Sequence, residues 1–284
     1  MSGNEHTAFA KQNFSISGAS GLYDRARPTY PEPALQKILS LLPPSAAVVE
    51  LGAGTGLFSR GLLNAALAKP GSVSEWLAVE PSEGMRVGFE KKLPEVAALE
   101  GSGLQVAIVD GLFDKIPVED GKADLVVVAQ AFHWVGKDGE SALREIARVL
   151  KPGAFFVAIW NLEDRSVPWV AQLRDAYEVY EAGTPQYRHG YWKSIFETAF
   201  YPGTFEAPVQ ELYHRDLPAT EQGVIDRVLS KSFITALSEE EQAKVVKEIE
   251  AVLKKGEGMK WINEDEGIFE YPYDTDLYVI RKKE

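Results

Sequence analysis

Residues 48–57, VVELGAGTGL, place a short apolar run directly before three alternating glycines. The valines favour a buried strand, because β-branched side chains pack well on a pleated surface. Gly52, Gly54 and Gly56 allow a sharp turn and a close approach of a ligand to the main chain. Residues 57–68 are rich in helix formers and carry apolar side chains at helical spacing. A strand, a glycine turn and a helix together predict a site for a nucleotide-like ligand at the carboxyl end of a parallel strand.

Strands and helices alternate along the chain up to about Asn161, as expected of βαβ units. Such units predict a parallel sheet with right-handed crossovers. The fold class predicted is therefore α/β, with a Rossmann-like, mostly parallel sheet of seven strands and helices on both faces. Strands are expected at 47–51, 75–80, 104–110, 123–130 and 154–161, and helices at about 31–42, 56–68, 82–93 and 136–150.

The pattern changes after Asn161, where helical and aromatic segments replace the alternation. We interpret them as a helical cap over the mouth of the sheet, inserted after strand five and before the last strand. Within the cap we expect a strand near 209–216 and helices at about 220–234 and 238–255. The predicted division is a flexible N-terminal arm (1–21), a Rossmann-like core (22–161), a mainly helical cap or substrate region (162–270) and a final core strand (271–284).

Composition argues against several other classes of protein. The formal net charge of −12 is unlike that of a nucleic-acid-binding protein, whose affinity comes largely from neutralising phosphates. The chain has no cysteine, so disulfides, thiolate catalysis and cysteine-ligated metals are excluded, and its four histidines are too scattered to predict a metal site. No window approaches 18 uninterrupted apolar residues, and the N-terminus lacks an apolar signal core. We expect a soluble cytoplasmic protein with no nucleic-acid or membrane partner; the sequence does not indicate its oligomeric state.

The glycine spacing argues against a dinucleotide ligand. A dinucleotide fingerprint requires a third glycine three residues after the second, where this chain has Leu57. Acidic residues end three successive strands, namely Glu50, Glu80 and Asp110. Their carboxylates suit an amino group, the two hydroxyls of a ribose and an exocyclic adenine amine, and no basic residue stands where a phosphate would lie. S-adenosylmethionine carries those three groups and no phosphate.

Six motifs follow one another in order: YDRARPTYP, ELGAGTG, VEPSEGM, VDG, AQAFHW and LREIARVLKPGAFFVAIWN. Together they resemble the class I S-adenosylmethionine-dependent methyltransferases, and more narrowly the type 11 group that includes trans-aconitate methyltransferase-like proteins. The resemblance is strong over about 22–161 and weak beyond. The gap from Gly56 to Glu80 is longer than is common in the family, and Glu80 stands where Asp is common, but Glu keeps both acceptor oxygens.

The resemblance implies S-adenosylmethionine as the cofactor and assigns its contacts. The glycine turn would lie under the methionine part, and Glu80 would bind the ribose. Asp110 would bind the adenine, and Gln130 would form the main-chain wall near the sulfonium. A lid segment from Tyr23 to Tyr30 would close over the cofactor. The complete cofactor set is Tyr23, Arg27, Glu50, Gly52, Ala53, Gly54, Gly56, Glu80, Pro81, Met85, Asp110, Gly111, Gln130 and Ala131.

His133 follows the fourth strand and is the one candidate catalytic residue. Its imidazole could act as a general base, although HW at this place in the family often shapes the pocket wall without proton chemistry. The cap aromatics could line a substrate pocket or form the core of the cap. Arg165 and Arg188 would suit a carboxylate-bearing acceptor if either pointed inward. The predicted substrate set is Tyr30, His133, Trp134, Trp160, Arg165, Trp169, Tyr191 and Phe233.

The predicted activity is transfer of a methyl group to a small organic acceptor, with oxygen as the default acceptor atom. Transfer is an in-line SN2 displacement, and positioning alone can lower such a barrier by ~7–11 kcal/mol. One alternative is a protein that binds S-adenosylmethionine but catalyses an isomerisation or cyclisation. A second alternative, which the sequence favours less, is an NAD-dependent oxidoreductase.

Overall fold

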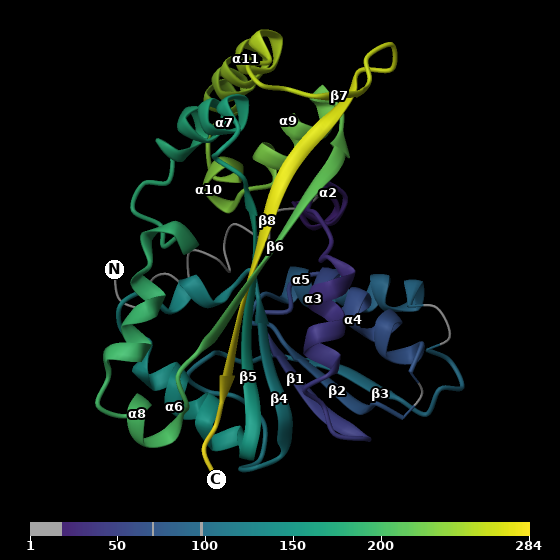
Figure 1. Ribbon diagram of the computed structural model, residues 1–284, viewed down its shortest axis with the longest axis vertical. Helices are drawn as coiled ribbons and strands as arrows, with labels where there is room; N and C mark the ends of the chain where they lie inside the picture. Colours follow the sequence, from purple (N-terminus) through teal and green to yellow (C-terminus); the bar gives the residue numbers. More distant parts are fainter. Residues whose placement is uncertain (1–18, 70, 97–98) are drawn as a thin grey trace.

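The computed structural model describes residues 19–69, 71–96 and 99–284 (Figure 1). Its central sheet has the strand order β3-β2-β1-β4-β5-β8-β6, and a short strand β7 pairs with β8. The first five strands are parallel, whereas β8 is antiparallel to both of its long neighbours. The strands are β1 (Ala46–Leu51), β2 (Val73–Val79), β3 (Gln105–Val109), β4 (Ala123–Ala129), β5 (Leu150–Glu163), β6 (Val209–Ala219), β7 (Trp261–Asn263) and β8 (Ile268–Arg281). The predicted Rossmann-like fold is confirmed, with β7 as an additional strand.

Side chains alternate between two apolar layers on the faces of this sheet, as the period of a strand requires. On one face, Val48 and Val127 pack with α3 (Glu32–Leu39), α4 (Leu57–Leu67) and α5 (Glu83–Lys92). On the other face, Val49 and Val128 pack with α6 (Glu140–Val149) and several short helices. These are η2 (Phe132–Val135), η4 (Tyr191–Glu197) and α8 (Tyr201–Thr204), while η1 (Leu93–Glu95) and η3 (Tyr187–His189) are single turns elsewhere.

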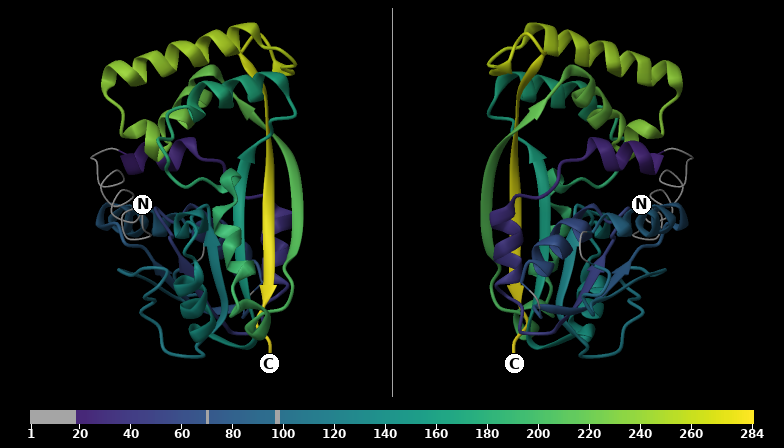
Figure 2. Two further views of the ribbon diagram at one scale, coloured as in Figure 1. Left: turned by 90° about the vertical axis from the view of Figure 1, so that its left-hand side faces the viewer. Right: turned by 90° about the vertical axis from the view of Figure 1, so that its right-hand side faces the viewer.

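The helices at the far end form a separate layer, which we call the helical lobe. It consists of α7 (Pro168–Glu178), α9 (Glu221–Leu229), α10 (Ser232–Thr235) and α11 (Glu239–Lys255). Figures 1 and 2 show that β5, β6 and β8 run out of the core into this lobe. Phe269, Tyr271 and Tyr273 on β8 belong to the lobe's apolar core. The lobe is therefore built on the continuation of the same sheet.

Two local features of the helical lobe concern where its helices begin and end. Ser238 caps α11, and Glu241 completes a capping box with it, so this helix begins where the sequence predicts. The helix predicted over 220–234 is broken after Leu229, and Ser230 and Lys231 lie in the break. Lys231 in the break reaches the carboxylate of Glu163 at the end of β5 (2.9 Å). Within the described ranges, no helix has both the length and the apolar character needed to span a bilayer.

Candidate active site

A cavity lies between the carboxyl ends of β1, β2, β4 and β5 and the helical lobe. We call the part lined by Gly52, Gly54, Glu80, Gly111 and Gln130 the glycine half. The cap half is lined by Glu163, Arg174, Tyr177, Arg227 and Lys231. Twelve of the predicted site residues line this cavity: Arg27, Gly52, Gly54, Glu80, Pro81, Met85, Gly111, Gln130, Ala131, His133, Trp134 and Phe233.

The three glycines of the turn have different structural reasons to be glycine. All three have positive φ, which favours a residue without Cβ. A Cβ on Gly52 would lie 2.7 Å from Ala131, and one on Gly56 would lie 2.6 Å from the ring of Phe89. A Cβ on Gly54 would meet nothing within 4 Å. Packing therefore requires Gly52 and Gly56, whereas Gly54 leaves open space on the cavity wall.

Glu80 connects the glycine turn to the next helix. Its Oε2 accepts a hydrogen bond from the N–H of Gly54 (2.9 Å), and its Oε1 accepts one from the N–H of Ser82 (2.8 Å). Ser82 is the N-cap of α5. A carboxylate acts only as an acceptor, and each of its oxygens can take more than one donor. The buried Glu80 thus fixes the turn and also offers acceptors to the cavity.

Glu50 lies behind the glycine turn and does not line the main cavity. With Tyr30 and Ala53 it lines a small side cavity that also touches Arg27 and Gly54. Its carboxylate accepts a hydrogen bond from the hydroxyl of Ser59 on α4. Burial raises the pKa of Glu50 to about 8, against the lowering effect of the Ser59 hydroxyl. The group is therefore protonated over most of the neutral range.

Gln130 stands at the carboxyl end of β4 in a strained conformation. Its φ is +57°, a region that side chains with Cβ adopt at a cost. Its main-chain N–H donates to the carbonyl of Ile159 (2.8 Å), and its side-chain amide donates to the carbonyl of Asn161 (2.9 Å). These two bonds to β5 hold the residue on the cavity wall.

Asp110 differs from the other two strand-end acids. It follows β3, the edge strand, and its side chain is 66% exposed. A guanidinium nitrogen of Arg86 lies 3.2 Å from its carboxylate, and Asp110 does not line the cavity, although Gly111 does. An edge strand leaves its last side chain free to turn toward solvent, which explains this placement.

The segment before the sheet lies across the cavity, as the predicted lid would. The guanidinium of Arg27 donates to the hydroxyl (3.1 Å) and the carbonyl (3.0 Å) of Ser230 in the helical lobe. Helix α2 (Ala19–Ala26) is tied to the glycine turn by Asp24, which accepts a hydrogen bond from the hydroxyl of Thr55 (3.0 Å) and pairs with Arg60 on α4 at 2.5 Å. Tyr23 belongs to this helix, but its side chain lies outside the described part of the structure.

His133 lies in η2 and lines the cavity beside Trp134. The indole N–H of Trp160 donates to its Nδ1 (3.3 Å). Burial lowers the pKa of His133 to about 3, and the positive charges of Arg27 and His189 act in the same direction. The imidazole is therefore neutral at physiological pH.

The cap half contains buried charges that the sequence did not single out. The carboxylate of Glu163 lies 3.1 Å from Arg227 and 2.9 Å from Lys231. Burial would raise the pKa of Glu163, but Arg227, Lys231 and Arg174 outweigh it, so the pKa lies below its usual range. Burial and the neighbouring Arg227 lower the pKa of Lys231 to about 7, against the opposing effect of Glu163. No local motif marks these residues; only the folding of β5, α7 and α9 brings them together.

The fold and the sequence place this chain among known proteins. The family described as "Methyltransferase domain" matches residues 49–158. An uncharacterised methyltransferase-like protein of Schizosaccharomyces pombe is 32% identical over 237 residues, which are 82% of this chain and 83% of that protein. The chain belongs to the methyltransferase family. Its motifs and sheet are those of the class I members, whereas the trans-aconitate-like subgroup stays a prediction.

Two further comparisons show a more limited likeness to known proteins. An uncharacterised methyltransferase of Mycobacterium tuberculosis is 36% identical over 163 residues, and the match spans only 58% of that relative's length and 57% of this chain. The YcgJ protein of Bacillus subtilis has the same fold, with a TM-score of 0.54 and 17% identity over 89% of this chain and all of that one. The methyltransferase-domain match ends at residue 158, before the residues of the cap half.

Several residues predicted to bind substrate lie away from the cavity of this methyltransferase-family member. Trp160 is fully buried between Tyr187 and Trp192, and Trp169 is buried in the core of the helical lobe. Arg165 lies on the surface, paired with Asp175 and Glu178. Tyr191 is 42% exposed, and Lys137 lies over its ring. Trp169 serves only the core of the lobe, whereas Tyr177 and Phe233 belong to that core and also line the cavity, as Tyr187 does.

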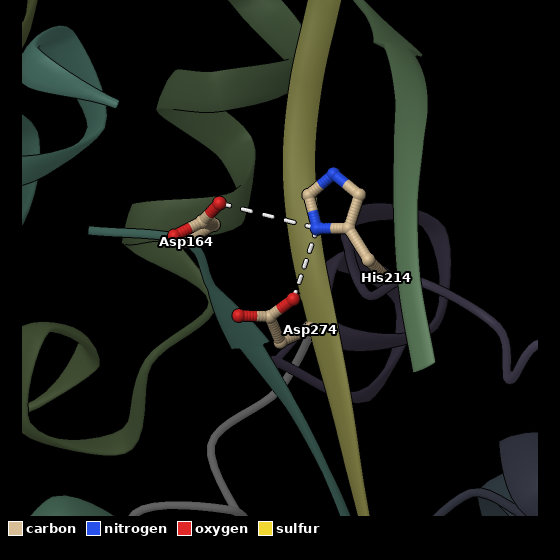
Figure 3. A group of neighbouring side chains, drawn as sticks. All are labelled: Asp164, His214 and Asp274. Atoms are coloured by element: carbon tan, nitrogen blue, oxygen red, sulfur yellow. Dashed lines mark hydrogen bonds and ion pairs between the residues drawn. The ribbon is translucent and has the colours of Figure 1, made fainter. Parts of the chain in front are cut away.

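A second group of ionisable side chains lies outside the cavity, where β5, β8 and β6 meet (Figure 3). Nδ1 of His214 is 2.9 Å from a carboxylate oxygen of Asp274 and 3.9 Å from one of Asp164. Asp216 lies 3.5 Å from Nε2. The hydrogen bond to Asp274 raises the pKa of His214, and the other two carboxylates add to the effect. The carboxylates thus favour the protonated form of the imidazole. The scattered positions of the histidines in the sequence did not predict the cluster.

Proposed function

We propose that the protein transfers a methyl group from S-adenosylmethionine to a small organic acceptor. The observation that carries the proposal is the carboxylate of Glu80, which Gly54 and Ser82 hold on the wall of the glycine half. This carboxylate suits the two hydroxyls of a ribose. Leu57 stands where a dinucleotide site would need its third glycine. The open space beside Gly54 lets a ligand approach the main chain there.

The other contacts proposed for the cofactor use residues around the same half. Glu50 lines the side cavity and would attract an ammonium group once it is ionised, and Arg27 suits a carboxylate. Met85 and Gly111 would enclose the adenine. Asp110 would have to leave Arg86 to reach an adenine amine. The complete proposed cofactor set remains the one predicted from the sequence.

When bound, S-adenosylmethionine supplies a methyl group that its sulfonium has already activated. The task of the chain is then to align the acceptor and to exclude water, which can lower the barrier by ~7–11 kcal/mol. Arg27 and Asn161 serve that task by fastening the lid segment to the lobe and to β5: Arg27 bonds Ser230, and the amide of Asn161 donates to the carbonyls of Pro28 and Thr29.

For the acceptor we propose a carboxylate-bearing molecule with an apolar body, bound in the cap half. The cavity wall there carries Arg27, Arg174, Arg188, Arg227 and Lys231, against Glu163, Glu178 and Glu181. Nη1 of Arg227 is buried and makes no hydrogen bond to any residue that the structure describes. A buried donor without an acceptor is costly, so an anionic group of the substrate would complete the arrangement. Phe233 and Tyr177 supply the apolar surface.

The test is incubation of the protein with methyl-labelled S-adenosylmethionine and a panel of aryl and alkyl carboxylic acids, each beside its neutral amide. We expect label in one or more acids, release of S-adenosylhomocysteine, and little label in the amides. Chemical change of an acceptor without transfer of label would favour the isomerisation or cyclisation alternative. Hydride transfer with NAD and no label transfer would favour the oxidoreductase.

A further inference from the structure

His133 and Trp160 form a hydrogen bond that determines where the imidazole carries its proton. An indole N–H can only donate, so Nδ1 of His133 is the acceptor in the 3.3 Å contact. A neutral imidazole whose Nδ1 is unprotonated carries its hydrogen on Nε2. The one lone pair of the neutral ring therefore points at Trp160, away from the cavity.

Packing fixes the side chain of Trp160, so its N–H stays directed at Nδ1 of His133. Its side chain is fully buried on β5. The rings of Trp192 and Tyr187 lie 4.6 and 4.8 Å from its own, and Tyr278 lies edge-on at 6.1 Å. A side chain packed on several sides in this way keeps one rotamer, so the direction of its N–H is fixed.

Burial keeps the ring neutral, and the charged groups around it act in the same direction. Arg27 from the lid segment and His189 from η3 are the charged or titratable groups that act on His133, and both disfavour a second proton. Among the residues that the structure describes, none accepts a hydrogen bond from Nε2, and the ring lines the cavity. The edge of the imidazole opposite Nδ1 therefore offers an N–H group to whatever the cavity binds.

We infer that His133 binds the methyl acceptor as a hydrogen-bond donor through Nε2–H, and that Trp160 positions it for this role. His133 then removes no proton from the acceptor, since its lone pair is engaged. The acceptor atom must arrive with its electron pair free, as the oxygen of an ionised carboxylate does. The role toward a substrate rests on the proposed function, whereas the tautomer does not.

The tautomer can be measured without cofactor or acceptor. We expect ¹⁵N NMR spectra of the labelled protein to show His133 with a protonated Nε2 and an unprotonated Nδ1 from pH 5.5 to 8.5, with no titration. The His133→Gln variant identifies the signals. A protonated Nδ1, or a titration within that range, would overturn the inference even if methyl transfer were demonstrated.

Matched variants test the positioning role of Trp160. In Trp160→Phe the donor is lost, and we expect the Nδ1–H tautomer of His133 to become populated. Trp192→Phe is the control, because Trp192 is equally buried and its indole N–H has no hydrogen-bond partner in the described structure. An unchanged tautomer in Trp160→Phe would refute the role, and failure of that variant to fold would leave the wild-type spectrum as the deciding measurement.

Kinetics with an acceptor found by the labelling experiment give a second readout. Glutamine keeps a side-chain N–H but cannot act as a base at neutral pH. We therefore expect His133→Gln to retain kcat within about tenfold, while His133→Leu loses about 10- to 100-fold more, the effect of one hydrogen bond to a charged group. Equal, severe losses in both variants would indicate a general base and contradict the inference.

Discussion

The two halves of the cavity are constructed in different ways. The glycine half depends on the main chain: positive φ values at Gly52 and Gly54, and amide N–H groups that hold Glu80. The cap half depends on charged side chains that come from β5, α7, α9 and the break after α9, and that neutralise one another around Glu163. The glycine half therefore depends mainly on backbone conformation around Glu80, and the cap half depends on side-chain charge, so their functions should be separable by mutation.

The largest effect is expected where the cap half loses its central charge. Glu163→Gln leaves Arg227 and Lys231 buried beside a neutral group, which typically costs about 3–5 kcal/mol of folding free energy. Urea denaturation measures this loss. Glu240→Gln, which removes an exposed partner of Lys244, should cost less than about 0.5 kcal/mol. Equal stability of the two variants would show that the buried charges do not hold the cap half together.

The next effect concerns the glycine half alone. Gly54→Val would fill the open space on the cavity wall, and we expect affinity for S-adenosylhomocysteine to fall by at least about 100-fold, or about 2.7 kcal/mol. Gly121→Val is the control for backbone strain, because Gly121 has a similar φ (+62° against +58°), also faces open space, and does not line the cavity. Calorimetry should show normal binding in the control. A similar loss in both variants would assign the effect to strain.

A smaller change should separate acceptor binding from cofactor binding. Arg227→Lys keeps the positive charge beside Glu163 but loses the free Nη1 donor. We expect kcat/KM for an anionic acceptor to fall by about tenfold, with the affinity for S-adenosylhomocysteine unchanged within about twofold. Arg165→Lys, at an exposed position of the same lobe, should change neither quantity. Loss of cofactor affinity in Arg227→Lys would show that the two halves of the cavity do not bind their ligands independently.

The smallest expected effect depends on pH. Burial raises the pKa of Glu50 to about 8, so raising the pH from 7 to 8 ionises it, and an ionised carboxylate attracts the ammonium group of the ligand. Affinity for S-adenosylhomocysteine should therefore rise about fivefold between pH 7 and 8, since the ionised fraction of the free protein rises by that factor. The rise should be absent in Glu50→Gln. Identical pH profiles for the two proteins would remove Glu50 from the proposed site.

The glycine half could be predicted because its determinants are local in sequence. A strand, a glycine turn and a helix occupy the 22 consecutive residues 46–67, and Glu80 follows the next strand. Asp110 shows the limit of that reasoning, because the edge position of β3 left its side chain free to pair with Arg86. The cap half could not be predicted, because Arg174, Arg227 and Lys231 stand in ordinary helical sequence. Their convergence depends on β5 and β8 extending beyond the core and on the break after Leu229, which no composition or periodicity indicated.

The central claim is that the acid at the end of β2 binds the ribose of an adenosyl amino acid, beside a glycine turn whose spacing does not fit a dinucleotide. Isothermal titration of the wild-type protein, Glu80→Ala and Glu83→Ala with S-adenosylhomocysteine and with NAD tests it most directly. Glu83 is an exposed acid three residues away and serves as the control. We predict that the wild type and Glu83→Ala bind S-adenosylhomocysteine alone, and that Glu80→Ala binds it about 10- to 100-fold more weakly, as expected for lost hydrogen bonds to a charged group. Undiminished affinity in Glu80→Ala, or binding of NAD by the wild type, would contradict the account.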